Sequence, residues 1–194
     1  MNVCRIKSYA KINLALNVTG KLTLLHKIES IVSFIDLYDL IFIKKTNKKN
    51  HQISFYGKFS KNISSNNTVR KLFIILEEKK LLKDKKFQIK IKKNIPQKAG
   101  LGGGSMNAAS ILNFLIKKKF INISQKKIKY ISNLIGSDVI LGLNSSNIIL
   151  SSNNIIKNFS KCPKFHTLLI KPDFGCSTKK IYLGVKKFTK SKFN

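Results

Sequence analysis

The sequence predicts a domain of mixed α-helices and β-strands, and three local patterns carry this prediction. Residues 87–92 alternate apolar side chains with glutamine or lysine, which is typical of a strand with one buried face. Residues 124–136 repeat apolar side chains at helical spacing, from Ser124, where the helix is expected to start, to a glycine that suits a helix end. Between these segments, four glycines fall within residues 100–104, and such a stretch favours neither helix nor strand.

The remaining elements follow from the same periodicities and from capping residues. A helix capped by Asn66 or Asn67 is expected to end near Lys79, where a run of lysines begins. A second helix is expected from about Ser105, as its N-cap, to Lys118. Strands are expected at residues 3–7, 11–18, 40–44, 52–56, 147–150 and 166–171.

The net charge of +30 over 194 residues would ordinarily indicate a nucleic-acid or membrane partner. Arg5 and Arg70 are the only arginines, however, and the lysines lie along the whole chain beside abundant isoleucine and asparagine. Arginine is the residue that bidentate phosphate and base recognition favours. We interpret the charge as a solvated lysine surface produced by A/T-rich codon usage. Specific nucleic-acid binding is not expected, and nonspecific polyanion binding stays as an alternative.

Other global features exclude several classes of protein. No apolar run approaches the ~20 residues that a membrane span needs, and the N-terminus lacks the pattern of a signal peptide. Cys4, Cys162 and Cys176 are scattered and odd in number, so neither a disulfide framework nor a zinc site is expected. These features predict a protein of the cytoplasm with no membrane partner.

The glycine-rich segment at residues 100–105, called the glycine loop below, carries the strongest chemical signal. A glycine loop that leads into a helix presents backbone amides and the positive end of the helix dipole, and this arrangement suits a phosphate group. The segment lacks the Gly-Lys-Ser/Thr ending of a Walker A loop and the acidic residue of a dinucleotide fingerprint. A purely structural turn is the alternative.

Two charged residues suit a phosphate-transfer site. Asp138 follows a predicted helix end in a glycine-flanked, apolar segment, and it is one of only eight acidic residues. Lys11 lies in an apolar segment near the N-terminus. A carboxylate can accept a hydroxyl proton while an ammonium stabilises the developing charge. By pattern alone, Asp138 could equally be a turn or cap residue, and Lys11 would be one surface lysine among many.

Three motifs in order resemble the first half of a GHMP-type small-molecule kinase. They are residues 9–14, the glycine loop with the alanine-containing helix behind it, and residues 136–139. Further matches in the family's order occur at residues 34–39, 67–69 and 171–178.

The resemblance implies roles for these residues. Asp138 matches the family's catalytic aspartate and Lys11 its partner lysine, which together would activate the substrate hydroxyl that attacks the γ-phosphate of ATP. Mg²⁺ would shield the phosphates. The residues that would hold the ATP phosphates are Pro96, Gly100, Leu101, Gly102, Gly103, Gly104 and Ser105.

The triple glycine resembles the members that act on a small-molecule diphosphocytidyl polyol. In these, His26 matches a histidine that reads the cytosine edge, and Thr178 and Tyr182 match substrate-side positions. Tyr182 could stack on the cytosine ring. Leu25 stands where the family has an aromatic residue, which is expected to weaken stacking. Met106 and Ile140 also depart from the pattern, replacing a serine and a proline.

The resemblance also implies the fold and the domains. We expect an α+β, two-layer GHMP kinase N-terminal domain of the ribosomal protein S5 domain 2-like type, with a left-handed β-α-β unit, over residues 1–154. Residues 155–194 would begin a truncated C-terminal domain, and a missing second-domain fragment could complete the site. The sequence pattern itself predicts a helix from Ser177. A catalytically inactive remnant and another GHMP kinase are the alternatives.

Overall fold

A computed structural model describes residues 2–22, 26–144, 146–153, 155–159, 165–172, 174–175 and 178–193. The chain divides into two units. Unit 1 comprises residues 1–10, 36–96 and 102–143, and unit 2 comprises residues 11–35, 97–101 and 144–194. Two long, mutually paired strands, β1 (Cys4–Lys21) and β2 (His26–Thr46), contribute residues to both units.

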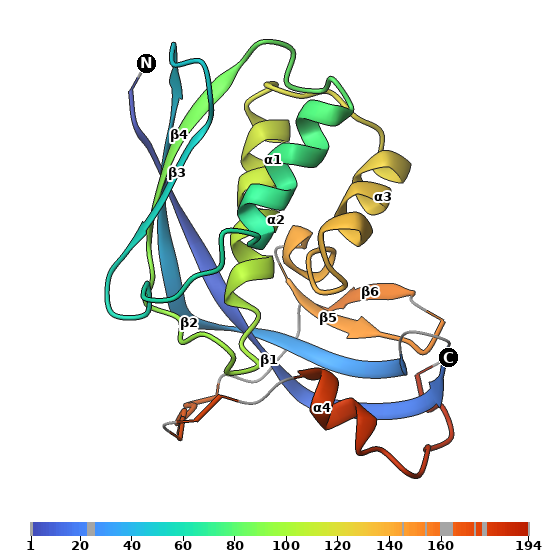
Figure 1. Cartoon of the computed structure of the whole chain (residues 1–194). Helices are drawn as coiled ribbons and strands as arrows, with labels where there is room; N and C mark the ends of the chain where they lie inside the picture. The colour runs from blue at the N-terminus through green and yellow to red at the C-terminus, as the bar shows by residue number, and fades with distance from the viewer. Residues whose placement is uncertain are drawn as a thin grey trace. The chain divides into compact units, whose positions relative to one another are not determined.

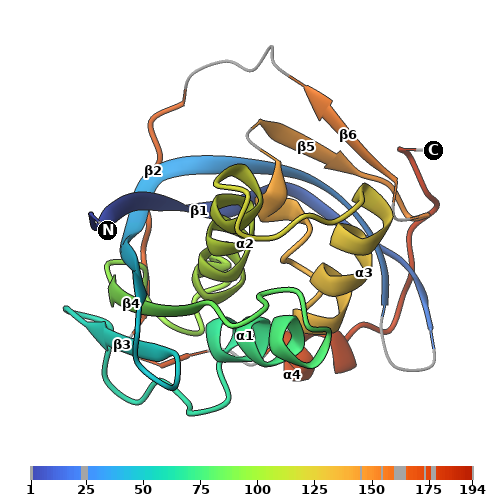
Figure 2. The ribbon, with the colours of Figure 1, turned by 90° about the horizontal axis from the view of Figure 1, so that it is seen from above.

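Unit 1 is a sheet with helices packed on one face (Figure 1). Strand β3 (Gln52–Tyr56) pairs in parallel with β4 (Lys86–Lys92), and β4 pairs antiparallel with the second half of β2, from Leu40 opposite Lys92 to Thr46 opposite Lys86. The helices α1 (Thr68–Glu78), α2 (Gly103–Lys117) and α3 (Gln125–Ile135) lie side by side over this sheet (Figure 2). The expected two-layer α+β fold is confirmed.

The inward alternation of β4 and the apolar faces of the helices form the core of unit 1. Phe87, Ile89 and Ile91 are fully buried, while Lys90 and Lys92 between and beside them are exposed. The apolar face of α1 contributes Val69, Leu72, Phe73, Ile75 and Leu76 to the same core.

Capping explains where the helices of unit 1 begin and end. The Asn67 side chain accepts a hydrogen bond from the Arg70 amide at 3.1 Å, and the Ser124 side chain accepts one from the Lys127 amide at 3.4 Å. Gly136 ends α3. The helix boundaries predicted at these residues are confirmed.

The predicted N-cap of α2 is wrong. Gly102, with φ of 68°, is the N-cap, so α2 begins two residues earlier than Ser105. Glycine adopts this left-handed conformation without the steric cost that a Cβ would add. Ser105 therefore lies inside the first turn of the helix.

In unit 2, the first half of β2 pairs antiparallel with β5 (Asn147–Leu150), and β5 pairs antiparallel with β6 (Ile156–Phe159). Strand β6 was not anticipated, because Lys157 and Asn158 at its centre break the apolar pattern that marks β5. The helix α4 (Thr178–Leu183) lies where a short helix was expected, although Ser177 itself falls outside the described residues.

Four strand predictions need correction. Residues 4–7 and 11–18 belong to one strand, β1, and β2 extends far beyond residues 40–44, because pairing between strands overrides weak local patterns. The strand predicted at residues 166–171 is absent from this described segment, which has no regular structure. Leu168 and Ile170 are each 84% exposed, so the apolar run has no sheet to pack against.

Among the described residues, no helix has the length and hydrophobicity to cross a membrane.

Candidate phosphate-transfer site

The glycine loop and the first turn of α2 present a row of backbone amides. Gly100 and Gly102 have φ values of 72° and 68°, both in the left-handed region. The Met106 amide makes the first intrahelical bond, to the Gly102 carbonyl at 2.9 Å. The amides of residues 103–105 precede it and have no acceptor within the helix. This end of α2 therefore has the geometry and the dipole that suit an anionic oxygen.

Close packing beneath the loop requires glycine at the start of α2. A Cβ on Gly103 would lie 3.0 Å from Ile95 Cγ2, and a Cβ on Gly104 would lie 3.1 Å from Thr68 Oγ1. The Thr68 hydroxyl also donates to the Gly104 carbonyl at 2.6 Å. The first turn of α2 is thus held between the segment after β4, where Pro96 follows Ile95, and the first residue of α1.

The predicted aspartate lies in unit 1, in the turn that follows α3. Asp138 is half-buried, and its carbonyl accepts from the Leu141 amide at 3.2 Å. The neighbouring Val139 is fully buried and anchors the turn in the core. A Cβ placed on Gly136 would lie 4.0 Å from Ser105 Oγ, so this turn packs beside the first turn of α2. The structure therefore brings together two of the predicted site segments in unit 1.

The predicted lysine lies in unit 2, in the part of β1 that adjoins the loop. Lys11 is only 7% exposed, unlike the surface lysines that dominate the chain. Its amide donates to the Leu101 carbonyl at 3.1 Å, and its Nζ donates to Asn13 Oδ1 at 2.7 Å. Asn13 in turn donates to Ser30 Oγ at 2.6 Å. Lys11 is thus held by polar contacts next to the start of the glycine loop.

Two of the predicted substrate-side residues meet within unit 2. The rings of His26 and Tyr182 are stacked, with centroids 5.3 Å apart and an interplanar angle of 21°. This spacing is that of rings in direct contact, so a base would have to stack on an outer face or separate the pair. Thr178 is the first residue of α4, and Leu25 lies outside the described residues.

Asp39 is the buried group of this region to which the sequence assigned no role. Its carboxylate is fully buried, and Asp39 lies within β2 as the last residue of the 34–39 motif. It accepts hydrogen bonds from the amides of Asn94 and Ile95, in the segment between β4 and the glycine loop. An acidic residue in a strand rich in apolar side chains was the available signal, but its partners lie more than fifty positions away.

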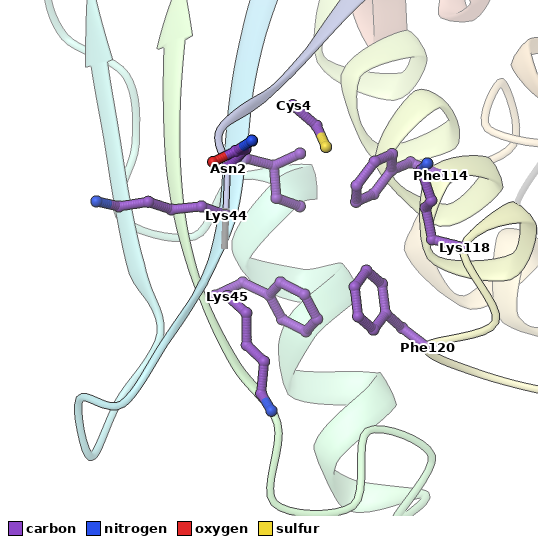
Figure 3. A pocket seen from close by; sticks show the side chains of 9 residues that line it. Asn2, Cys4, Lys44, Lys45, Phe114, Lys118 and Phe120 are labelled. Atoms are coloured by element: carbon purple, nitrogen blue, oxygen red, sulfur yellow. The ribbon is translucent and has the colours of Figure 1, made fainter.

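Unit 1 also contains an apolar pocket of about 90 Å³ that is separate from the candidate site (Figure 3). Phe87, Phe114 and Phe120 line it together with Cys4 and three lysines, and none of the predicted site residues does. Among the described residues, no group of three histidine, cysteine, aspartate or glutamate side chains could hold a metal ion.

The comparisons with known proteins agree with this geometry. The family model of the GHMP kinases N terminal domain matches residues 67–152, a range that includes the glycine loop and the Asp138 turn. A homoserine kinase from Cytophaga hutchinsonii aligns with a TM-score of 0.61 at 14% identity, covering 97% of this chain and 62% of its own. A crystal structure of 4-(cytidine 5'-diphospho)-2C-methyl-D-erythritol kinase aligns with a TM-score of 0.63 at 22% identity, covering 81% and 55%. The fold is that of a GHMP-type small-molecule kinase, a class that uses ATP.

Curated relatives identify the family within this class of kinases. The 4-diphosphocytidyl-2-C-methyl-D-erythritol kinase of Pelagibacter ubique (strain HTCC1062) is 62% identical over 194 residues, which are 100% of this chain and 69% of the relative. The enzyme of the same name from Clostridium perfringens (strain 13 / Type A) is 35% identical over 183 residues, 93% of this chain and 63% of the relative. The chain belongs to the 4-diphosphocytidyl-2-C-methyl-D-erythritol kinase family and spans about two thirds of the length of these relatives.

Proposed function

We propose that the chain transfers the γ-phosphate of ATP to the 2-hydroxyl of 4-diphosphocytidyl-2-C-methyl-D-erythritol, a step in non-mevalonate isoprenoid precursor biosynthesis. The observation that carries the proposal is the amide row at the start of α2, packed beside the Asp138 turn through Ser105 and Gly136. The 62% identity to the Pelagibacter ubique relative supports the choice of substrate.

In the proposed reaction, the substrate hydroxyl oxygen attacks the γ-phosphorus, and the bond from this phosphorus to the bridging oxygen of ADP breaks. Asp138 accepts the hydroxyl proton, and ADP leaves with the electron pair of the broken bond. The ammonium of Lys11 stabilises the negative charge that develops on the transferring group. The amides of residues 103–105 bind the phosphate oxygens.

Mg²⁺ would supply charge neutralisation of the ATP phosphates when bound. Magnesium in such sites keeps several waters and takes few protein ligands beside the phosphates, which fits a region without a cluster of three acidic side chains among the described residues. Ser105, in the first turn of α2, would offer a hydroxyl oxygen to join them.

For the second substrate, we propose that His26 and Tyr182 form the cytosine-binding surface, with Thr178 nearby at the start of α4. The rings of His26 and Tyr182 stack directly on one another although they come from distant parts of the sequence. A base can stack on the outer face of Tyr182, because every base offers a π-face.

The test is ATP-dependent phosphorylation by the purified chain, followed as ADP release and as phosphorylated polyol. Asp138→Asn is expected to lower turnover by roughly 10²- to 10⁴-fold, because a general base contributes on that order. Asp84→Asn is the matched control, since Asp84 is an exposed aspartate in another turn of unit 1. Folded wild-type chain that neither turns over nor gains thermal stability with ATP would overturn the proposal.

The net charge of +30 favours one alternative, a catalytically inactive remnant that binds polyanions without specificity. This alternative predicts binding to DNA of any sequence that weakens steeply with salt. It also predicts no dependence on Asp138. A third candidate, a different GHMP kinase, predicts turnover with another alcohol and none with the diphosphocytidyl polyol.

A further inference from the structure

Asp39 is a fully buried carboxylate in the part of β2 that belongs to unit 1. One of its oxygens, Oδ1, accepts from the Asn94 amide at 2.8 Å and from the Ile95 amide at 2.9 Å. These two amides follow the last residue of β4 almost directly. They therefore hold the chain at the point where it leaves the sheet and approaches the glycine loop.

The second oxygen of Asp39 reaches two other elements. Oδ2 accepts from Asn107 Nδ2, in the second turn of α2, at 2.9 Å. It also accepts from the Nζ of Lys93, which is itself only 4% exposed, in a buried ion pair. The carboxylate of Asp39 thus connects β2 to residues 93–95, which precede the glycine loop, and to α2, which follows it.

The chain that precedes the glycine loop also packs against the first residue of α2. A Cβ on Gly103 would lie 3.0 Å from Ile95 Cγ2 and 3.3 Å from Lys93 Nζ. Ile95 is completely buried. Unit 1 therefore includes the chain on both sides of residues 97–101, and Asp39 bonds to both of these sides.

The charge arrangement at this junction is unusual. The ammonium of Lys93 lies beside the first turn of α2, where the helix dipole is positive. Without a carboxylate, a buried cation at this place would be unfavourable. Asp39 compensates the cation and leaves the positive end of the helix available to a ligand.

We propose that Asp39 is a positioning residue for nucleotide phosphate binding: its carboxylate fixes the chain on both sides of the glycine loop, at residues 93–95 and 107, so that the amides of residues 103–105 keep their geometry. The inference rests on the proposed ATP-dependent function and deepens it. Asp39 does not touch the phosphates and acts through Ile95, Asn107 and Lys93. An ion pair that served only the core would affect stability and leave nucleotide binding unchanged.

The first arm of the experiment measures amide hydrogen exchange of the full chain and needs no activity. In Asp39→Asn, peptides covering residues 94–107 are expected to exchange about tenfold faster, while peptides from α1 and β4 keep their wild-type rates. Asn107→Ala removes one of the four bonds and leaves the ion pair, so it is expected to give a smaller change in the same peptides. A uniform increase across unit 1, or no increase, would contradict the positioning role.

The second arm measures steady-state kinetics of the same variants. Asp39→Asn is expected to raise the KM for ATP about tenfold, because small displacements of a binding group are costly, with an unchanged KM for the polyol. Glu77→Gln is the matched control, since Glu77 forms the lysine–carboxylate pair with Lys86 at the exposed side of unit 1. Its KM for ATP is expected to equal that of the wild type.

The two arms separate the possible failures. If the wild type does not turn over ATP, the proposed function fails, and the exchange arm still decides whether Asp39 fixes the loop. If the loop exchanges faster in Asp39→Asn but the KM for ATP is unchanged, the link between Asp39 and nucleotide binding is wrong. The inference is supported if the loop exchanges faster in Asp39→Asn and the KM rises for ATP but not for the polyol.

Discussion

The two units hold their predicted site residues by different means. In unit 1, the glycine loop's helix and the Asp138 turn are mounted on a continuous apolar core that includes Leu72, Leu112 and Val139. In unit 2, the buried apolar side chains among the described residues are Val32, Ile148 and Leu150. The support of Lys11 is instead a chain of hydrogen bonds through Asn13 and Ser30.

Because of this difference, substitutions in the two units are expected to differ in how much they change stability. Packing fixes the first turn of α2 within unit 1, so changes there are expected to affect folding and the proposed phosphate binding together. Strand pairing and hydrogen bonds fix Lys11 and the stacked rings in unit 2, so changes there can affect function with little effect on the core. Substitutions matched between the units can test this distinction.

The largest effect is expected in unit 2. Lys11→Met keeps the length of the buried side chain and removes its ammonium, so turnover is expected to fall by roughly 10²- to 10⁴-fold with little change in stability. The measurement is the kcat of purified protein beside its thermal midpoint. Lys7→Met, on the same strand at an exposed position, is the control and should retain wild-type turnover. Comparable losses in both variants would point to a general effect of surface charge.

The next effect tests the core of unit 1. Leu72→Ala removes a fully buried side chain from the centre of the core and is expected to lower the free energy of unfolding by about 2–5 kcal/mol. Leu168→Ala, at a leucine of unit 2 that is 84% exposed, should change it by less than about 0.5 kcal/mol. Urea unfolding at equilibrium gives both values. Equal losses would mean that the core extends into unit 2.

The parts of the fold that local chemistry decides could be predicted from the sequence. Asn67, Ser124 and Gly136 cap their helices through bonds that span only a few residues, and the alternation of β4 depends on its own side chains. The run at residues 166–171 shows the limit of this reasoning, because its apolar residues have no paired strand in the described structure.

The site shows the same division. The glycine loop was recognisable because its conformation depends on its own glycines, whereas the exact start of α2 depends on the left-handed turn at Gly102. The role of Asp39 could not be predicted, since its partners at residues 93–95 and 107 approach only when the sheet and α2 have packed. The catalytic assignments of Lys11 and Asp138 stay predictions.

A smaller effect is expected at the loop itself. Gly103→Ala places a Cβ 3.0 Å from Ile95 Cγ2, so Ile95 or the loop must move by a few tenths of an ångström, and the KM for ATP is expected to rise about tenfold. The control is Gly100→Ala, where a Cβ would meet nothing within 4 Å and only the φ of 72° is strained. If Gly100→Ala raises the KM as much as Gly103→Ala, backbone strain and not crowding governs the loop.

The smallest effect is expected at Glu29, the fully buried carboxylate of unit 2. Burial raises the pKa of Glu29, but hydrogen bonds from Asn17, Ser191 and the amides of Lys192 and Phe193 lower it more, to about 2. Because this value lies below the ordinary 4.5, the unfolded chain takes up the proton first as the pH falls. The stabilisation is therefore complete above pH 4.5 and is lost progressively towards pH 2.

This loss should be local to unit 2. In the wild type, the amide resonances of Lys192 and Phe193 are expected to shift with a midpoint near pH 2, as the carboxylate that accepts from them is protonated. In Glu29→Gln they should differ from the wild type at neutral pH and show no such titration, so the two proteins converge as the pH falls. Glu77→Gln, in unit 1, is the control and should leave both resonances unchanged. A wild-type midpoint near 4.5 would show that these hydrogen bonds do not favour the ionised carboxylate, and that unit 2 gains no stability from them.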